Sequence, residues 1–204
     1  NRISSMEIEE SGIGFIFHND RVVKFDDSEF YRRYFNCLPH SKGVDFVCEA
    51  GGKRALIEVK NCLGHEAENI WRIGSDNAKR EVVTPSPGDD RESLDIEMSL
   101  KAAMTIACLC GALSKERGCS HAETLSDICR PLGNVGLGGE PLYIILFLEG
   151  NFYFETRSKK MIMERLQTSI RKKLSWLNCS VSVTDSSTYK KKFFTIRQNQ
   201  TGSC

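Results

Sequence analysis

Two strand-like segments joined by Gly51-Gly52 constrain the fold more than any other feature of this sequence. The segments VDFVCEA and KRALIEVK are largely apolar, and a two-residue glycine turn between such segments is typical of a tight antiparallel hairpin. A turn of this length fixes the register, so we expect Asp45 directly opposite Glu58, with Lys60 on the same face. The other face is apolar and is expected to pack on the core. It consists of Val44, Phe46, Cys48, Ala55, Ile57 and Val59.

The polar face of this hairpin brings two carboxylates and an ammonium group together. Like charges directly opposite one another destabilise a sheet, so Asp45 and Glu58 need a compensating charge. Lys60 could supply it, and so could a divalent cation, because Mg²⁺ and Mn²⁺ prefer carboxylate oxygens, main-chain carbonyls and waters as ligands. The structural alternative is a plain surface hairpin in which Lys60 forms an ion pair with Asp45 or with Glu58.

Periodicity along the rest of the chain predicts an α/β fold, with a mixed central sheet flanked by helices. The expected elements are a hairpin over 12–25 turning at Asn19-Asp20, a helix over 27–37 capped by Asp26 or Asp27, one short helix within the polar stretch 61–90, a helix over 92–113, loops over 114–140, a buried strand over 142–148, a helix from its cap at Ser158 to about 177, and strands at CSVSVTD and FFTIR. The 204 residues are expected to form one domain, with a core over about 12–150 and a basic helix and closing strands over 151–197.

Composition excludes several classes of protein. Hydrophobic residues make up 40% of the chain, which lies within the range of globular proteins and excludes a wholly disordered one. The longest apolar run, Leu142 to Leu148, is far shorter than the ~20 residues that span a bilayer, so no membrane association is expected. Nine cysteines in irregular spacing, without a signal-like start, favour free thiols in an intracellular compartment, either the cytoplasm or the nucleoid or nucleus.

Charge is unevenly distributed along the chain. From Asn151 onward there are 11 Lys and Arg residues against 3 Asp and Glu, whereas the part before it is acidic. Such asymmetry favours a polyanionic partner for the basic end, and the alternative is a basic face that only contacts solvent. The candidate nucleic-acid-binding residues are Lys159, Lys160, Arg171, Lys172, Lys190, Lys191 and Lys192.

The segment VDFVCEAGGKRALIEVKN resembles the catalytic hairpin of the PD-(D/E)xK nuclease superfamily, which has the restriction-endonuclease-like fold. That family carries an acidic residue near the start of one strand and an E-x-K on the next, here Asp45 and Glu58-Val59-Lys60. Its core is a helix, three antiparallel strands, a helix and a further strand. The expected elements follow this order if the hairpin over 12–25 supplies one strand of the three. Val44 stands where the family motif often has proline, and no Gln-x-x-x-Tyr element follows Lys60.

The resemblance implies a nuclease that hydrolyses phosphodiester bonds with Mg²⁺ or Mn²⁺, with DNA favoured over RNA as substrate, and it is compatible with a homodimer. It implies that Asp45, Glu58 and the main-chain carbonyl of Val59 bind the metal and that Lys60 assists the attacking water. Family members often carry another acidic residue in the first helix, for which Glu29 is the candidate. The main alternative is a catalytically inactive nucleic-acid-binding module of the same fold, and a third is a protein-interaction domain that uses the long loops.

Several other motifs have a functional and a structural interpretation. A zinc site could use Cys108, Cys110, Cys119, His121 and Cys129, but the first two point to different sides of the expected helix, which favours small buried side chains. The glycines of GNVGLGGE lack a following Lys-Ser/Thr, which favours a simple connection over a phosphate loop. His40 and His65 flank the hairpin and could approach its polar face. Trp71 could stack on a base, and the alternative is a buried anchor.

Overall fold

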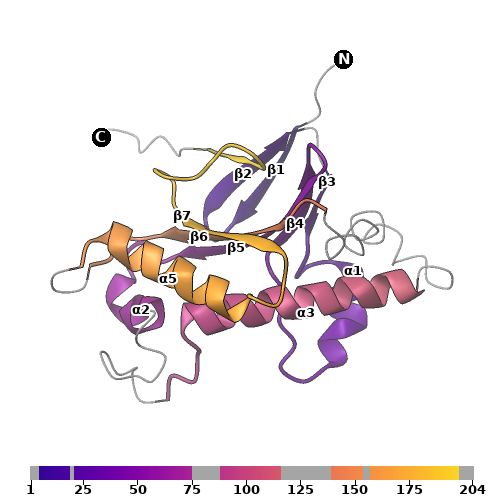
Figure 1. Cartoon of the computed structure of the whole chain (residues 1–204), viewed down its shortest axis with the longest axis horizontal. Coiled ribbons are helices and arrows are strands. Elements are labelled where there is room, and N and C mark those ends of the chain that lie inside the picture. The colour runs from indigo at the N-terminus through magenta and orange to yellow at the C-terminus, as the bar shows by residue number, and fades with distance from the viewer. Residues whose placement is uncertain (1–4, 19–20, 75–87, 116–138, 154–156, 198–204) are drawn as a thin grey trace.

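The computed structural model describes residues 5–18, 21–74, 88–115, 139–153 and 157–197. Within these ranges the chain is a mixed α/β protein with a small sheet, a large sheet and a layer of helices (Figure 1), which confirms the expected fold class. The strands are β1 (Ser5–Glu10), β2 (Ile13–His18), β3 (Arg21–Lys24), β4 (Phe46–Ala50), β5 (Lys53–Asn61), β6 (Leu142–Glu149), β7 (Cys179–Thr184) and β8 (Thr195–Arg197). The helices are α1 (Glu29–Arg33), α2 (Glu66–Ile73), α3 (Leu94–Lys115) and α5 (Lys159–Lys173), with a 3-10 turn η1 (Phe35–Cys37).

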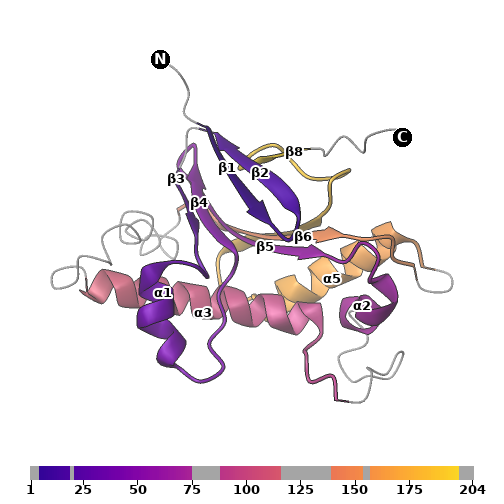
Figure 2. The same ribbon diagram turned by 180° about the vertical axis from the view of Figure 1, so that it is seen from behind.

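The large sheet combines antiparallel and parallel strands in the order β3-β4-β5-β6-β7. β3, β4 and β5 form an antiparallel meander, and β6 and β7 continue the sheet parallel to β5. Parallel neighbours need long crossover connections, which contain α3 between β5 and β6 and α5 between β6 and β7. Figure 2 shows that both helices lie on the same side of this sheet.

The hairpin predicted at Gly51-Gly52 is present with the expected register. β4 pairs with β5 from Phe46–Ile57 to Ala50–Lys53. The turn needs positive φ at both of its central residues, and the two glycines have φ values of 54° and 74°, which glycine adopts without steric cost. Continued by one position, the same register brings Asp45 opposite Glu58.

Both faces of the large sheet are buried. On one face Phe46 and Ile57 pack against Phe15 of the small sheet. On the other face Leu56 shares an apolar cluster with side chains of α3 and α5. Glu58 lies two residues beyond Leu56 and therefore points to the helix side, under α3. The polar face of the hairpin is therefore buried as well, which excludes the plain surface hairpin considered above.

The hairpin predicted over 12–25 is also wrong. β2 pairs with β1 and with β8, whereas β3 pairs with β4, so the two predicted arms belong to different sheets. The tight turn that does form is Ser11-Gly12 between β1 and β2, where φ is 52° and 77°. The sequence of β1, SMEIEE, is largely exposed and lacks the apolar pattern of a core strand, which is why it was missed. The predicted turn at 19–20 lies outside the described residues.

The helices lie where the sequence predicts them, but some of them differ from the predictions in length. α1 begins after Ser28, whose hydroxyl caps its first turn, so the cap is neither Asp26 nor Asp27, and the helix gives way to η1. α5 begins after the expected cap Ser158 but ends before residue 177. α2 is the short helix expected within 61–90.

Helix α3 runs beneath the sheet for 22 residues. By length and apolar composition it would also pass as a membrane-spanning helix, a test that core helices of globular proteins pass as well. Three of its polar residues, Glu97, Lys101 and Thr105, recur every four positions and therefore share one face. All three contact the hairpin or its neighbours, as described next.

Candidate active site

Asp45 and Glu58 are nearly inaccessible to solvent. Their exposed fractions are 6% and 1%. The main-chain carbonyl of Asp45 accepts the N–H of Phe25 at 2.7 Å, which holds this residue beside the end of β3. Two carboxylates are thus placed inside the protein on neighbouring chain segments, at the point where β4 begins.

β4 and β5 separate just beyond this pair. The N–H of Val44 donates to Thr105 Oγ1 of α3 at 3.1 Å, so Val44 packs beneath α3 and not beside Phe46 as expected. The N–H of Val59 donates to Asp45 Oδ2 at 2.6 Å. The carboxylate thus accepts a hydrogen bond that a main-chain carbonyl of the neighbouring strand would accept in a regular sheet. The N–H and C=O groups of one strand residue face the same edge, so the carbonyl of Val59 also faces Asp45. This opening gathers two carboxylates and a main-chain carbonyl.

Two ammonium groups converge on Glu58. Lys60 Nζ lies 2.8 Å from Glu58 Oε1, and Lys101 Nζ of α3 lies 2.7 Å from the same oxygen. Lys60 also pairs with Glu97 at 2.9 Å, and Glu97 in turn binds Arg72 of α2. The other oxygen, Glu58 Oε2, is buried without a hydrogen-bond partner. The sequence analysis identified Lys60 as a site residue but did not identify Glu97, Lys101 or Arg72.

Lys60 is held in its charged form by this arrangement. Burial acts to lower the pKa of the Lys60 ammonium, but the adjacent carboxylates of Glu58 and Glu97 outweigh burial and raise the pKa above its ordinary value. Lys60 can therefore donate hydrogen bonds and stabilise negative charge, but it does not serve as a base near neutral pH.

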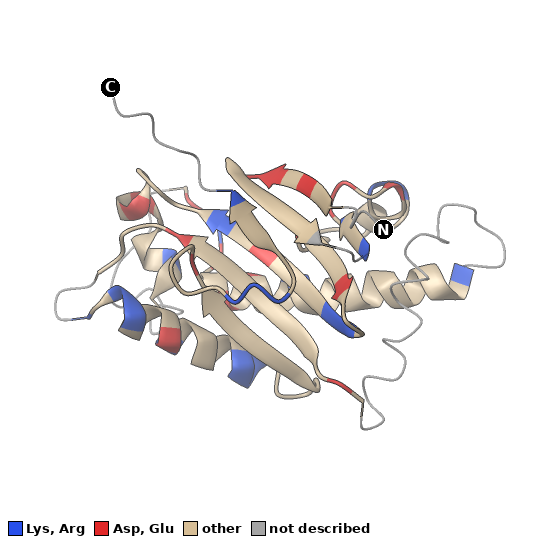
Figure 3. Cartoon of the chain, turned by 90° about the horizontal axis from the view of Figure 1, so that it is seen from above, with Lys and Arg blue, Asp and Glu red and all other residues tan. Residues whose placement is uncertain are grey.

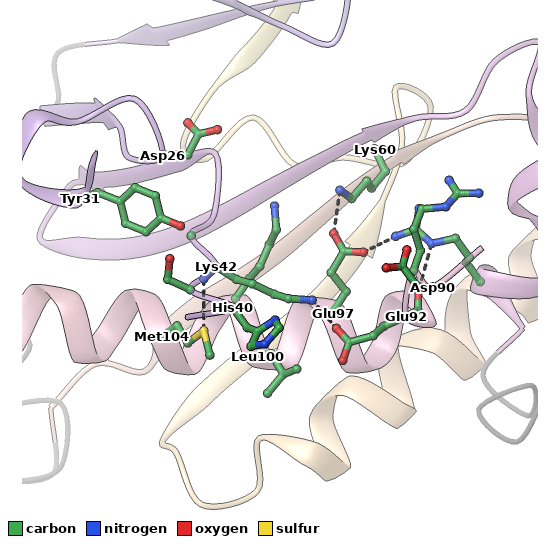
Figure 4. A pocket seen from close by; sticks show the side chains of 15 residues that line it. Asp26, Tyr31, His40, Lys42, Lys60, Asp90, Glu92, Glu97, Leu100 and Met104 are labelled. Atoms are coloured by element: carbon green, nitrogen blue, oxygen red, sulfur yellow. Dashed lines mark hydrogen bonds and ion pairs between the residues drawn. The ribbon is translucent and has the colours of Figure 1, made fainter. Parts of the chain in front are cut away.

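A cavity of about 850 Å³ opens next to these charges. Lys60, Lys101 and Glu97 contribute to its wall, and so do the segment before β4 and the segment before α3 (Figure 4). In Figure 4, Asp26 and Tyr31 lie at one end of the cavity and Asp90 lies toward the other end, with Glu97 between them. Neither Asp45 nor Glu58 lines this cavity, whereas both lysines that bind Glu58 do.

Glu29, the candidate for an additional acidic ligand, is not part of this cavity. It pairs with Arg33 at 3.6 Å and borders a separate surface hollow. Asp26 lines the cavity instead, and its Oδ1 is buried without a hydrogen-bond partner. Burial raises the pKa of Asp26, and the charge of Asp27 adds to this effect. Asp26, and not Glu29, is therefore the acidic residue next to α1 that borders the cavity.

The basic residues expected to hold nucleic acid do not gather on one element (Figure 3). Lys159 pairs with Asp185 at 2.6 Å, and Lys160 lies 4.0 Å from a carboxylate one turn further along α5. Arg171 and Lys172 are exposed in the last turn of α5. Among the predicted nucleic-acid-binding residues of α5, Arg171 and Lys172 are therefore the best placed to contact a phosphate backbone.

Lys190, Lys191 and Lys192 lie on the other side of the large sheet. Lys192 Nζ is 3.7 Å from the centre of the Tyr143 ring, and Tyr143 packs in the cluster between the two sheets. Since Glu58 faces α3, one nucleic-acid surface that includes both the cavity and these lysines would have to extend around the edge of the sheet.

The remaining motifs from the sequence analysis can be located where they fall within the described residues. Trp71 is buried in α2, and Cys108 is buried in α3 while Cys110 is exposed. His40 lines the cavity, whereas His65 is exposed at the start of α2. The remaining proposed zinc ligands and the GNVGLGG glycines lie outside the described residues. Among the residues that are described, no group of three or more His, Cys, Asp or Glu side chains is placed to hold a metal.

Comparison with known proteins gives a family but no activity. A family model described as "Family of unknown function (DUF6661)" matches residues 28–198. The chain belongs to the DUF6661 family. No curated protein and no solved structure matches it. The matched range of this DUF6661 chain contains Asp45, Glu58, Lys60 and Lys101, and it leaves out β1, β2 and β3.

Within the described residues of this DUF6661 protein, Glu58 pairs with two lysines, whereas Asp45 forms no ion pair. Burial, followed by the charge of Glu58, raises the pKa of Asp45 to about 8, although Lys101 and the N–H of Val59 act in the opposite direction. A divalent cation would reverse this effect, because metal ligation favours the ionised carboxylate. The unpartnered Glu58 Oε2 and the carbonyl of Val59 are further oxygen donors. The donor set therefore fits Mg²⁺ or Mn²⁺, which Asp45, Glu58 and the carbonyl of Val59 would hold.

This pKa predicts an unusual pH dependence of stability. In folded protein without metal, Asp45 keeps its proton up to about pH 8, whereas the unfolded chain loses that proton near pH ~4. The folded state thus binds more protons in this window, so the free energy of unfolding should fall as pH rises, by up to ~1.4 kcal/mol per pH unit. Urea unfolding of the parent and of Asp45→Asn at pH 5, 6 and 7 measures the difference. Equal slopes for the two proteins would contradict the prediction.

Proposed function

We propose that this DUF6661 protein is a divalent-metal-dependent nuclease of the PD-(D/E)xK type that hydrolyses phosphodiester bonds. One observation carries the proposal: the opening between β4 and β5 brings together buried Asp45 and Glu58 and directs the Val59 carbonyl toward them, with Lys60 beside Glu58. Carboxylates on neighbouring strands followed by a lysine two residues on are the pattern through which the sequence resembles that superfamily.

The order of strands supports the proposal. The superfamily core has three antiparallel strands, a helix and a further strand, and here β3, β4 and β5 form a meander that α3 connects to β6. One element departs from that core, because α1 lies between β3 and β4 instead of ahead of the meander. Asp45 directly precedes β4 and Glu58 lies in β5, so the two carboxylates belong to consecutive segments, as in the superfamily pattern.

The residues of the site suit attack on a phosphodiester. A bound Mg²⁺ or Mn²⁺ would act as a Lewis acid toward a phosphate oxygen and would lower the pKa of a bound water. Lys60 has three N–H donors, of which its two carboxylate partners take two, so the third can orient the water or hold a phosphate oxygen. Glu97 and Arg72 fix the position of Lys60 from the side of the helices.

The proposal is tested with purified protein and a panel of single- and double-stranded DNA and RNA. We expect cleavage in the presence of Mg²⁺ or Mn²⁺, none with EDTA, and a preference for DNA. Absence of cleavage across the panel, with both metals and with Mn²⁺ shown to bind, would reject the nuclease.

An inactive nucleic-acid-binding module is the second candidate, and a specific observation favours it. Glu58 already has two ammonium partners, so its charge is balanced without any metal. Such a module would bind nucleic acid in a salt-dependent way and would not cleave it, whereas a protein-interaction domain would do neither.

Nucleic-acid binding gives a further prediction about the end of α5. Arg171 and Lys172 are exposed there, so the double variant Arg171→Ala/Lys172→Ala should bind duplex DNA more weakly. The slope of log K against log salt should become shallower by ~0.9 for each phosphate that the variant no longer binds. Fluorescence anisotropy over a series of salt concentrations, without metal, measures this, with Arg32→Ala/Arg33→Ala in the last turn of α1 as the matched control. An unchanged slope in the double variant would show that this end of α5 only contacts solvent.

A further inference from the structure

Lys101 places a positive charge next to the buried carboxylate of Glu58. Its Nζ lies 2.7 Å from Glu58 Oε1, and it reaches that oxygen from α3, on the far side of the site from the hairpin that supplies the carboxylates. Its charge also acts to lower the pKa of Asp26, of Asp45 and of Glu97, so the ammonium lies within electrostatic range of all four carboxylates.

Lys101 differs from Lys60 in how it is fixed. Lys60 is held between Glu58 and Glu97, at 2.8 and 2.9 Å, and belongs to the same strand as Glu58. Lys101 has Glu58 as its one ion-pair partner within the described residues, and its side chain lines the cavity. A lysine with one partner and open space beside it can change rotamer, while Lys60 cannot move without breaking two pairs.

We infer that Lys101 is a built-in counter-ion that competes with the divalent metal for Glu58 and thereby sets the metal affinity of the site. This inference rests on the proposed function. In protein without metal, the ammonium compensates the buried carboxylate, whose solitary charge would be costly. When a cation binds to Glu58 and Asp45, Lys101 leaves Glu58 and turns into the cavity. Metal binding must therefore break this ion pair, which lowers the apparent affinity.

The inference predicts opposite effects for two substitutions. Lys101→Gln removes the competing charge, so metal binding no longer breaks an ion pair, and Mn²⁺ should bind about tenfold more tightly, which corresponds to ~1.4 kcal/mol. Lys101→Arg places a planar fork that can engage both Glu58 oxygens, including the unpartnered Oε2, and should bind Mn²⁺ more weakly than the parent. Lys42→Gln is the matched control, because Lys42 lines the same cavity but pairs with Glu92.

Isothermal titration with Mn²⁺ alone, together with thermal unfolding at each Mn²⁺ concentration, tests the order of affinities. Support consists of Lys101→Gln binding most tightly, the parent and Lys42→Gln equally, and Lys101→Arg most weakly. Equal affinities of the parent and Lys101→Gln would overturn the inference and leave the nuclease proposal standing. No Mn²⁺ binding by any of these proteins would overturn both. If Lys101→Gln does not fold, Lys101→Arg decides, and parent-like or tighter binding by it overturns the inference.

Discussion

Replacement of Glu58 by glutamine should reduce metal-dependent cleavage by ~10³-fold or more, because groups that act together in catalysis usually lose most of the activity when one of them is removed. Glutamine keeps the shape of the side chain in a position that is 1% exposed, whereas alanine would leave a cavity beneath α3 and would remove the ion-pair partner of Lys101. Initial rates of cleavage at saturating Mn²⁺, with circular dichroism as a check of folding, give the measurement.

Asp45→Asn and Lys60→Met should cause losses of similar size. Asparagine can still accept the N–H of Val59 through its amide oxygen, so the opening between the strands should persist without the charge. Glu49→Gln is the control, since Glu49 is a carboxylate of β4 that pairs weakly with Arg54 near the turn, at 3.9 Å. Parent-like cleavage by Lys60→Met would show that Lys60 has no catalytic role, and equal loss in Glu49→Gln would show that the effect is structural.

The largest expected effect on stability concerns Asp95, at the start of α3. Its side chain is fully buried and accepts hydrogen bonds from Ser93 at 2.6 Å, from Ser169 at 2.6 Å and from Lys173 at 2.8 Å. The last two belong to α5, so this carboxylate joins the two crossover helices. Asp95→Ala should lower the free energy of unfolding by ~3 kcal/mol, because it leaves the hydroxyls of Ser93 and Ser169 without their acceptor, while the exposed Lys173 can turn to solvent. Ser169→Ala should cost only ~1 kcal/mol.

The contribution of Asp95 to the free energy of unfolding should depend on pH. Burial alone would raise the pKa of Asp95, but the hydrogen bonds from Lys173, Ser169 and Ser93 outweigh burial and lower it. A lowered pKa means that Asp95 contributes stability above the unfolded value near pH ~4 and loses that contribution as the pH falls through its folded pKa. Urea unfolding from neutral pH into acid should therefore show parent and Asp95→Ala converging at the acid end. A constant difference between them would contradict this account.

The sequence predicted the hairpin of the site well, for a physical reason. A two-residue glycine turn allows one register, and the alternation of side chains then decides which residues share a face, so Asp45, Glu58 and Lys60 could be grouped from spacing alone. The strand over 142–148 was equally clear, because an uninterrupted apolar run is typical of a strand buried on both faces.

The partners of the site could not be found in the same way. Glu97, Lys101 and Thr105 form a polar line on α3, but the helix is apolar nearly all round and its rotation toward the sheet depends on tertiary packing. Their spacing of four residues was the available signal. Asp26 lies outside regular structure, so no periodicity assigns a direction to it. The assignment of β2 and β3 to different sheets likewise depends on β1, whose sequence gives a weak strand signal, and on the long-range pairing of β2 with the predicted strand β8.

Diffraction from crystals of the protein soaked in Mn²⁺, measured at a wavelength where manganese scatters anomalously, tests the central claim most directly. The account predicts an anomalous peak within ~2.2 Å of oxygens of Asp45 and Glu58 and of the carbonyl oxygen of Val59, with Lys101 turned away from Glu58. A soaked structure without a peak at this position, in which Lys60 and Lys101 both keep their pairs with Glu58, would contradict it.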